Sequence, residues 1–96
     1  MSVFITITGQ KHYFGLLPFS VGSEVLLKAD PENLYDSTAI SVYAPPYGKA
    51  GNVAQQDATR ADGTLSAAEI FPHIKENTRA IVRFIAGEYI IAEIME

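Results

Sequence analysis

The chain has 96 residues, of which 48% are apolar and 19% are charged, and its formal net charge is −4. These values are typical of one small folded domain, here residues 1–96, and they argue against intrinsic disorder. The chain has no cysteine, no basic start of a signal peptide and no apolar run near the ~18 residues of a membrane span, so we expect a cytoplasmic protein without membrane contact, disulfide or thiolate zinc site.

The first half of the chain alternates short apolar runs with polar turns. Residues 3–8 alternate branched apolar residues with threonine and end at Gly9, which predicts a strand with one buried face. Residues 25–27 and 39–43 predict two further short strands, and a polar loop over residues 30–37 separates them.

Two consecutive prolines, Pro45 and Pro46, then interrupt the chain, because proline supplies no amide donor for a strand ladder. A short strand is expected around residues 51–54. The polar residues 55–64 that follow predict a long loop.

The second half begins with a helix signal. Ser66 and Glu69 have the spacing of a capping box, so we expect one helix to begin there, and Pro72 should kink it or split it into two turns. Residues 80–85 and 89–94 predict the last two strands, joined as a hairpin.

These elements predict a mainly β fold, a small OB-like or SH3-like barrel of about six strands, with the helix covering one open end. Apolar residues within the predicted elements form the expected core. They are Phe4, Ile5, Ile7, Val25, Leu27, Ile40, Val42, Val53, Ile74, Ile81, Phe84, Ile90 and Ile94.

The residue types needed for catalysis or metal binding are sparse. His12 and His73 are the only histidines, and the acids Asp30, Glu32 and Asp36 do not have the spacing of a calcium loop. No Gly-rich phosphate loop, Gly-x-Ser-x-Gly elbow or His-Glu-x-x-His motif is present. We therefore expect a protein that is not an enzyme and uses no metal or cofactor.

Tyr35 stands out among the aromatic residues because it lies in a polar loop between Asn33 and Asp36. One interpretation is that Tyr35 stacks on a base while its neighbours address polar groups of a ligand. The other is that Asp30 and Asn33 only build a turn around Pro31. For Tyr35 and Asp36 the sequence leaves both interpretations open.

The charge distribution limits the kind of nucleic-acid site that is compatible with the sequence. Three acids fall in the last nine residues, so residues 1–87 carry 7 basic and 8 acidic groups, a balance of −1, and no basic stripe is present. Binding of long duplex DNA through its phosphate backbone is therefore disfavoured, whereas a pocket that binds the end of a single strand is compatible with this charge distribution. Convergence of Lys11, Lys28 and Lys49 beside Tyr35 would favour nucleic-acid binding, and an acidic surface there would oppose it.

The chain resembles the HIRAN domain, in its stand-alone bacterial type, over roughly residues 3–94. The matching segments are Gly9, residues 11–15, residues 25–27, residues 30–40 and residues 51–54. The most specific of them is residues 30–40, with the pattern Asp-Pro-x-Asn-x-Tyr-Asp-x-x-Ala-Ile. The resemblance implies an OB-like barrel that captures the 3′ end of single-stranded DNA in DNA repair or replication-fork processing.

The resemblance also implies roles for individual residues. Tyr35 corresponds to a base-stacking residue, Asp36 to the contact with the terminal 3′-hydroxyl, and Lys11 lies near a phosphate. His12 stands where many members have a second aromatic residue, and Tyr89 takes the place of an aromatic residue in the last hairpin. The implied interface is Lys11, His12, Tyr13, Asn33, Tyr35, Asp36, Asn52 and Tyr89.

Two functions from different classes follow. The first is a module that binds single-stranded DNA or a DNA 3′ end, working with a helicase or nuclease that acts in trans. Asn52 and Gln55 replace residues that help to hold the backbone in DNA-binding members, so the alternative is a non-catalytic domain that binds a protein or small ligand and has no affinity for nucleic acid.

Overall fold

A computed structural model describes residues 2–95 of the chain. Its strands are β1 (Phe4–Thr8), β2 (Glu24–Ala29), β3 (Ile40–Tyr43), β4 (Lys49–Val53), β5 (Arg79–Ala86) and β6 (Tyr89–Ile94). Its helical segments are η1 (Gln10–His12), η2 (Asp57–Thr59), α1 (Ala67–Ile70) and η3 (Phe71–His73). Every strand and the helix predicted from the sequence are present.

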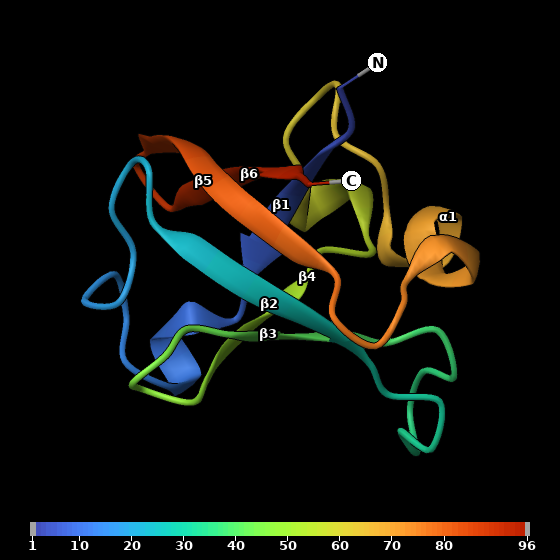
Figure 1. The fold of residues 1–96 in the computed structure, drawn as a ribbon. Coiled ribbons are helices and arrows are strands. Elements are labelled where there is room, and N and C mark those ends of the chain that lie inside the picture. The colour runs from blue at the N-terminus through green and yellow to red at the C-terminus, as the bar shows by residue number, and fades with distance from the viewer. Residues whose placement is uncertain (1, 96) are drawn as a thin grey trace.

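The strands close into an antiparallel barrel in the order β1-β4-β3-β2-β5-β6 (Figure 1). Strand β1 completes the circle by pairing with β4 on one side and with β6 on the other. Closure gives each of the described strands two neighbours, so no strand within residues 2–95 is left as a sheet edge. The mainly β barrel with a single short α-helix confirms the predicted fold class.

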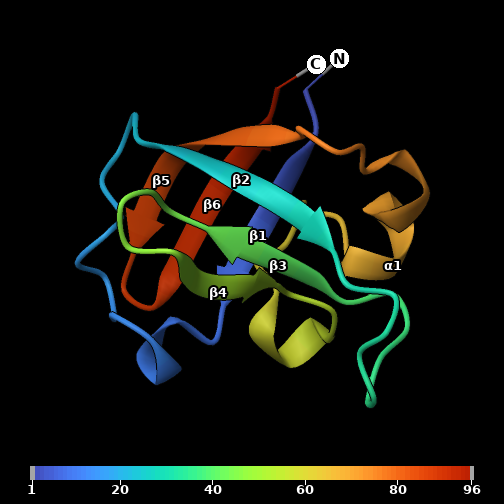
Figure 2. The ribbon, with the colours of Figure 1, turned by 60° about the horizontal axis from the view of Figure 1, so that its bottom comes forward.

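The helix begins where the capping box predicted. The Ser66 side chain accepts a hydrogen bond from the Glu69 amide, and the Glu69 carboxylate accepts one from the Ser66 amide. Pro72 splits the segment into α1 and the 3-10 turn η3. Ala67 and Ile70 are buried in the barrel core, which fixes α1 at one end of the barrel (Figure 2).

The core is filled by the inward-facing residues of the strands, and most of the predicted core residues are buried. Phe4, Ile81 and Phe84 are corrections to the prediction, because they lie on the outer face. Ile81 lies between buried Ala80 and Val82, and neighbouring residues of a strand point to opposite faces. Ile74 and Ile94 are only partly buried, packed against the edge of the core.

A β-bulge explains the outward position of Phe84. The register of β5 against β6 shifts between Val82 and Phe84, so that Phe84 pairs with the outward-facing Ile91 instead of continuing the inward row. Phe84 is 58% exposed, and its ring packs against that of Phe4 with centroids 6.5 Å apart. The pair forms a small aromatic cluster outside the barrel.

Gly51 allows β1 and η1 to approach β4 closely. A Cβ atom at this position would lie 2.9 Å from the Thr8 carbonyl oxygen and 3.0 Å from Cγ2 of Ile7. Contacts that short force neighbouring atoms to move, so glycine is the residue that fits. The close approach holds η1, which carries several predicted site residues, against β4.

Candidate nucleic-acid interface

The β2–β3 loop, residues 30–39, is built by side chains that hydrogen-bond to its own backbone. The Oδ1 atom of Asn33 accepts hydrogen bonds from the amides of Tyr35 at 2.9 Å and Asp36 at 3.0 Å. This arrangement is the turn that asparagine commonly makes with amides two and three residues ahead. Asn33 therefore shapes the turn that presents Tyr35, as the simpler interpretation of the sequence expected.

The Asp36 carboxylate accepts three hydrogen bonds. Its Oδ1 atom accepts from the Thr38 hydroxyl at 2.7 Å and from the Thr38 amide at 2.9 Å, and its Oδ2 atom accepts from Gln55 Nε2 at 3.1 Å. The Thr38 hydroxyl, followed by the Thr38 amide, holds the pKa of Asp36 below its ordinary value. Asp36 is therefore an ionised acceptor at neutral pH.

Gln55 connects the loop to the helix. Its Nε2 group donates to Asp36 and, at 2.8 Å, to the Thr38 hydroxyl, while its Oε1 atom accepts from the Ala68 amide at 2.8 Å. From the sequence, Gln55 was considered only as a replacement for a residue that contacts the DNA backbone, and no role was predicted for Thr38. The Asp-x-Thr spacing was the available signal for Thr38, because such pairs commonly bond within a turn.

Tyr35 projects from this braced loop into solvent. Its side chain is 96% exposed and that of the preceding Leu34 is 92% exposed. An exposed tyrosine is common, but this one lies between Asn33 and Asp36, whose side chains are both held by hydrogen bonds to the loop. The loop thus holds an aromatic face in the open beside an ionised carboxylate.

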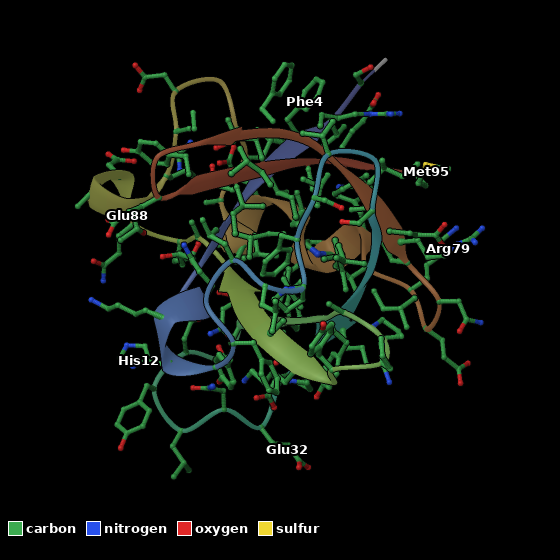
Figure 3. The ribbon with its side chains drawn as sticks, turned by 90° about the vertical axis from the view of Figure 1, so that its left-hand side faces the viewer. Phe4, His12, Glu32, Arg79, Glu88 and Met95 are labelled. Carbon is green, nitrogen blue, oxygen red and sulfur yellow. The ribbon has the colours of Figure 1, made fainter. Side chains whose placement is uncertain are left out.

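The predicted residues in and directly after η1 lie at another place, where Lys11, His12 and Tyr13 are all exposed. The Lys49 ammonium lies 5.5 Å from the centre of the Tyr13 ring, close enough for a cation–π interaction. The η1 turn is also tied to the β5–β6 hairpin, since Gln10 Nε2 donates to the Glu88 carbonyl at 3.0 Å. Figure 3 shows His12 and Glu88 on the same side of the barrel.

Tyr89 begins β6 directly after this hairpin and is 42% exposed, so it lies at the η1 end of the interface. Asn52 lies on β4 between the two groups. It pairs with Thr8 on one side and Ser41 on the other, and its Nδ2 atom faces Gly9 at the start of η1. The predicted residues therefore form a loop group around Tyr35 and an η1 group.

The two groups lie at opposite ends of β3, because the β2–β3 loop precedes this strand and the turn to Lys49 follows it (Figure 2). Within residues 2–95 no hydrogen bond joins them. Lys49 lies beside Tyr13, and the Lys28 ammonium lies 4.9 Å from the Tyr43 ring centre. The lysines therefore do not converge beside Tyr35, and the loop around Tyr35 carries the acids Asp30, Glu32 and Asp36. By the charge criterion set from the sequence, this arrangement opposes nucleic-acid binding at the loop.

The part of the chain that the structure describes contains no group of three or more His, Cys, Asp or Glu side chains arranged to hold a metal ion. None of the helices among residues 2–95 is long and apolar enough to cross a membrane.

Comparison with solved structures identifies the fold. A crystal structure of a protein from Lactobacillus plantarum superimposes with a TM-score of 0.66 and 22% identity, covering 98% of this chain and 93% of that one. The HIRAN domain of human HLTF superimposes with a TM-score of 0.62 and 21% identity, covering 97% of this chain and 74% of that one. No protein-family model and no curated protein sequence matches the chain. The chain therefore has the fold of the HIRAN domain, which confirms at the level of structure the resemblance predicted from its sequence.

Proposed function

We propose that this chain is a non-catalytic module that binds single-stranded DNA at its 3′ end. The observation that carries the proposal is the exposed ring of Tyr35 on a loop that Asn33 and Asp36 hold in one shape. The loop backbone beneath the ring is held by these hydrogen bonds, so it loses little conformational freedom when a base stacks on Tyr35, and one base–aromatic stack contributes about 1–3 kcal/mol.

Asp36 supports recognition of a terminal hydroxyl. A carboxylate has about four acceptor positions, and the described residues fill two on Oδ1 and one on Oδ2. Oδ2 therefore retains one position for a further donor. A 3′-hydroxyl can donate to it, whereas a 3′-phosphate would bring a second negative charge beside an ionised group.

The likeness in fold to the HIRAN domain of human HLTF supports DNA as the class of ligand, which the resemblance in sequence implies. We place the function in the cytoplasm, in DNA repair or replication-fork processing, with a helicase or nuclease acting in trans. The proposed interface joins the loop group to Lys11, His12, Tyr13, Asn52 and Tyr89 of the η1 group.

The test is a fluorescence-anisotropy titration at low salt with two oligonucleotides that differ only at the 3′ terminus. The strand with a free 3′-hydroxyl is expected to bind more tightly than the strand with a 3′-phosphate. Equal affinities would overturn end capture, and absence of binding to either strand at high micromolar protein would overturn nucleic-acid binding altogether.

Two substitutions in the same loop separate the hydroxyl contact from general charge. Asp36→Asn removes the repelling charge at the proposed contact and should narrow the difference between the two strands. Glu32→Gln removes the same charge from an exposed position in the same loop and should leave the difference nearly unchanged.

The second candidate function is binding of another protein, and one observation favours it. The connection between η1 and β2 exposes large apolar side chains, including Phe14 and Leu16, each 45% exposed, Leu17 at 72% and Val21 at 66%. Several exposed apolar side chains in one connection are typical of a segment that contacts another protein. This function would be favoured if neither oligonucleotide bound and Leu17→Ser reduced association with a partner protein.

A further inference from the structure

The basic residues of the chain fall into two classes. All three arginines are paired with carboxylates: Arg60 with Asp57, Arg79 with Glu24 and Arg83 with Glu93. The four lysines behave differently, because within residues 2–95 none of them forms a salt bridge. They are Lys11, Lys28, Lys49 and Lys75. Among the described residues, the lysine and arginine charge that is not paired with a carboxylate is therefore carried by the lysines.

Two of the lysines form a continuous row with two tyrosines. The Lys28 ammonium lies 4.9 Å from the centre of the Tyr43 ring, and the Lys49 ammonium lies 5.5 Å from that of Tyr13. Tyr43 and Lys49 are cross-strand partners on β3 and β4, so their side chains are neighbours on the same face. Lysine and tyrosine thus alternate across three strands and onto the residue that directly follows η1, in the order Lys28, Tyr43, Lys49 and Tyr13. We call these four residues the lysine–tyrosine row.

The outer face of the barrel carries the row. Val42 and Ala44 on either side of Tyr43 are buried, which directs Tyr43 outward, and Lys28 pairs with Ser41 on β3. The remaining lysines flank it: Lys75 lines a shallow hollow together with Lys28, and Lys11 lies in η1, two residues before Tyr13 in the sequence.

The position of the row relates the two groups of interface residues. Lys28 lies near the end of β2, two residues before the loop that presents Tyr35, while Tyr13 directly follows η1. Lys28 therefore stands on β2 near the loop, but its ammonium reaches the ring of Tyr43, the last residue of β3, so the row leads from there to the η1 end of that strand. No carboxylate forms a salt bridge with it among the described residues, and Glu76, which lines the hollow with Lys28, is the acid placed beside it.

We propose that the lysine–tyrosine row is the track for the nucleotides that lie on the 5′ side of the captured strand end. The proposal rests on the proposed function, because it assigns the path of a strand whose 3′ end lies at Tyr35. Lysines spaced between aromatic faces suit a single strand, since ammonium groups meet phosphates and rings meet bases without reading sequence. A duplex would hide its base faces and gain from the lysines alone.

The salt dependence of binding gives the track a measurable signature. For a single strand, log K falls with log salt with a slope of about −0.7 per phosphate neutralised. If all four lysines engage phosphates, the slope is about −2.8. Each lysine that leaves the track should reduce the magnitude of the slope by about 0.7.

The experiment measures this slope with a ten-nucleotide thymidine strand carrying a free 3′-hydroxyl. Lys28→Gln and Lys49→Gln are each expected to lower its magnitude by about 0.7, and the double variant by about 1.4. Arg83→Gln removes the same charge from a residue paired with Glu93 on β5 and β6, and should leave the slope unchanged. Thermal melting of each variant verifies folding, and the single variants suffice if the double variant is unstable.

Failure of the track and failure of end capture give different results. Unchanged slopes in the folded lysine variants, with wild-type preference for the 3′-hydroxyl retained, would overturn the track and leave end capture standing. Reduced slopes without any preference for the 3′-hydroxyl would support the track as a site for single strands and overturn end capture. Equal slope changes in Arg83→Gln and the lysine variants would overturn the track, because they would mark a long-range effect of net charge.

Discussion

Tyr35 and Leu34 are neighbours at the tip of the β2–β3 loop with nearly equal exposure and different chemistry. Tyr35→Ala should weaken binding of a single strand by about 1–3 kcal/mol, because it removes one stacking surface. The free energy of unfolding should change by less than about 0.5 kcal/mol, since the ring contributes almost nothing to the core.

Leu34→Ala is the matched control for that variant. It removes a side chain of similar exposure that has no π-face, so binding should remain at the wild-type level. Anisotropy titration combined with urea unfolding distinguishes the two variants. Equal losses of binding in both would contradict a stacking role, and unfolding of Tyr35→Ala would return the ring to a structural one.

The hydrogen bonds of Asp36 connect two elements of the fold. Gln55 donates to Asp36 in the β2–β3 loop and accepts from the Ala68 amide in the first turn of α1. In Asp36→Asn the amide group cannot accept hydrogen bonds at both former oxygens, so one of these contacts is lost. The variant should be less stable than the wild type by about 1 kcal/mol at neutral pH.

Comparison of the wild type with Asp36→Asn also yields a prediction for the pH dependence of stability. The pKa of Asp36 is lowered in the folded chain, so its contribution to stability is present above the ordinary carboxyl pKa and is lost as the pH falls through the lowered value. The difference in unfolding free energy between wild type and Asp36→Asn should therefore shrink below about pH 4. Urea unfolding at pH 7 and near pH 3 measures it, and a difference that grows on acidification would contradict the lowered pKa.

Elements that depend on local pattern were predictable from the sequence. Period-two alternation located β1, short apolar runs located the other strands, and the spacing of Ser66 and Glu69 located the helix start. The inward or outward position of Phe84 was not predictable, because the bulge before it reverses the alternation without a signal in the apolar pattern. The turn role of Asn33 followed from residue type, whereas the bridge made by Gln55 joins positions far apart in sequence and required the fold.

At the scale of the whole molecule, the proposed binding of a DNA strand depends more on where the charges lie than on the net charge. The net charge of −4 gives every basic residue equal weight. The three arginines, however, are paired with carboxylates, whereas the four lysines form no salt bridge among the described residues. The sequence showed no basic stripe because Lys28, Lys49 and their tyrosine partners come from separate strands and from the chain after η1. Barrel closure assembles them on one face.

The measurement that tests the site most directly is a nuclear magnetic resonance titration of the ¹⁵N-labelled protein with a short thymidine strand. With a free 3′-hydroxyl, the largest amide shifts should occur at residues 33–38 and at the Gln55 side chain, with smaller shifts along the lysine–tyrosine row. A 3′-phosphate should reduce the shifts at residues 33–38 first. Shifts confined to residues 16–21, or no shifts at high micromolar strand, would contradict capture of a DNA end at the Tyr35 loop.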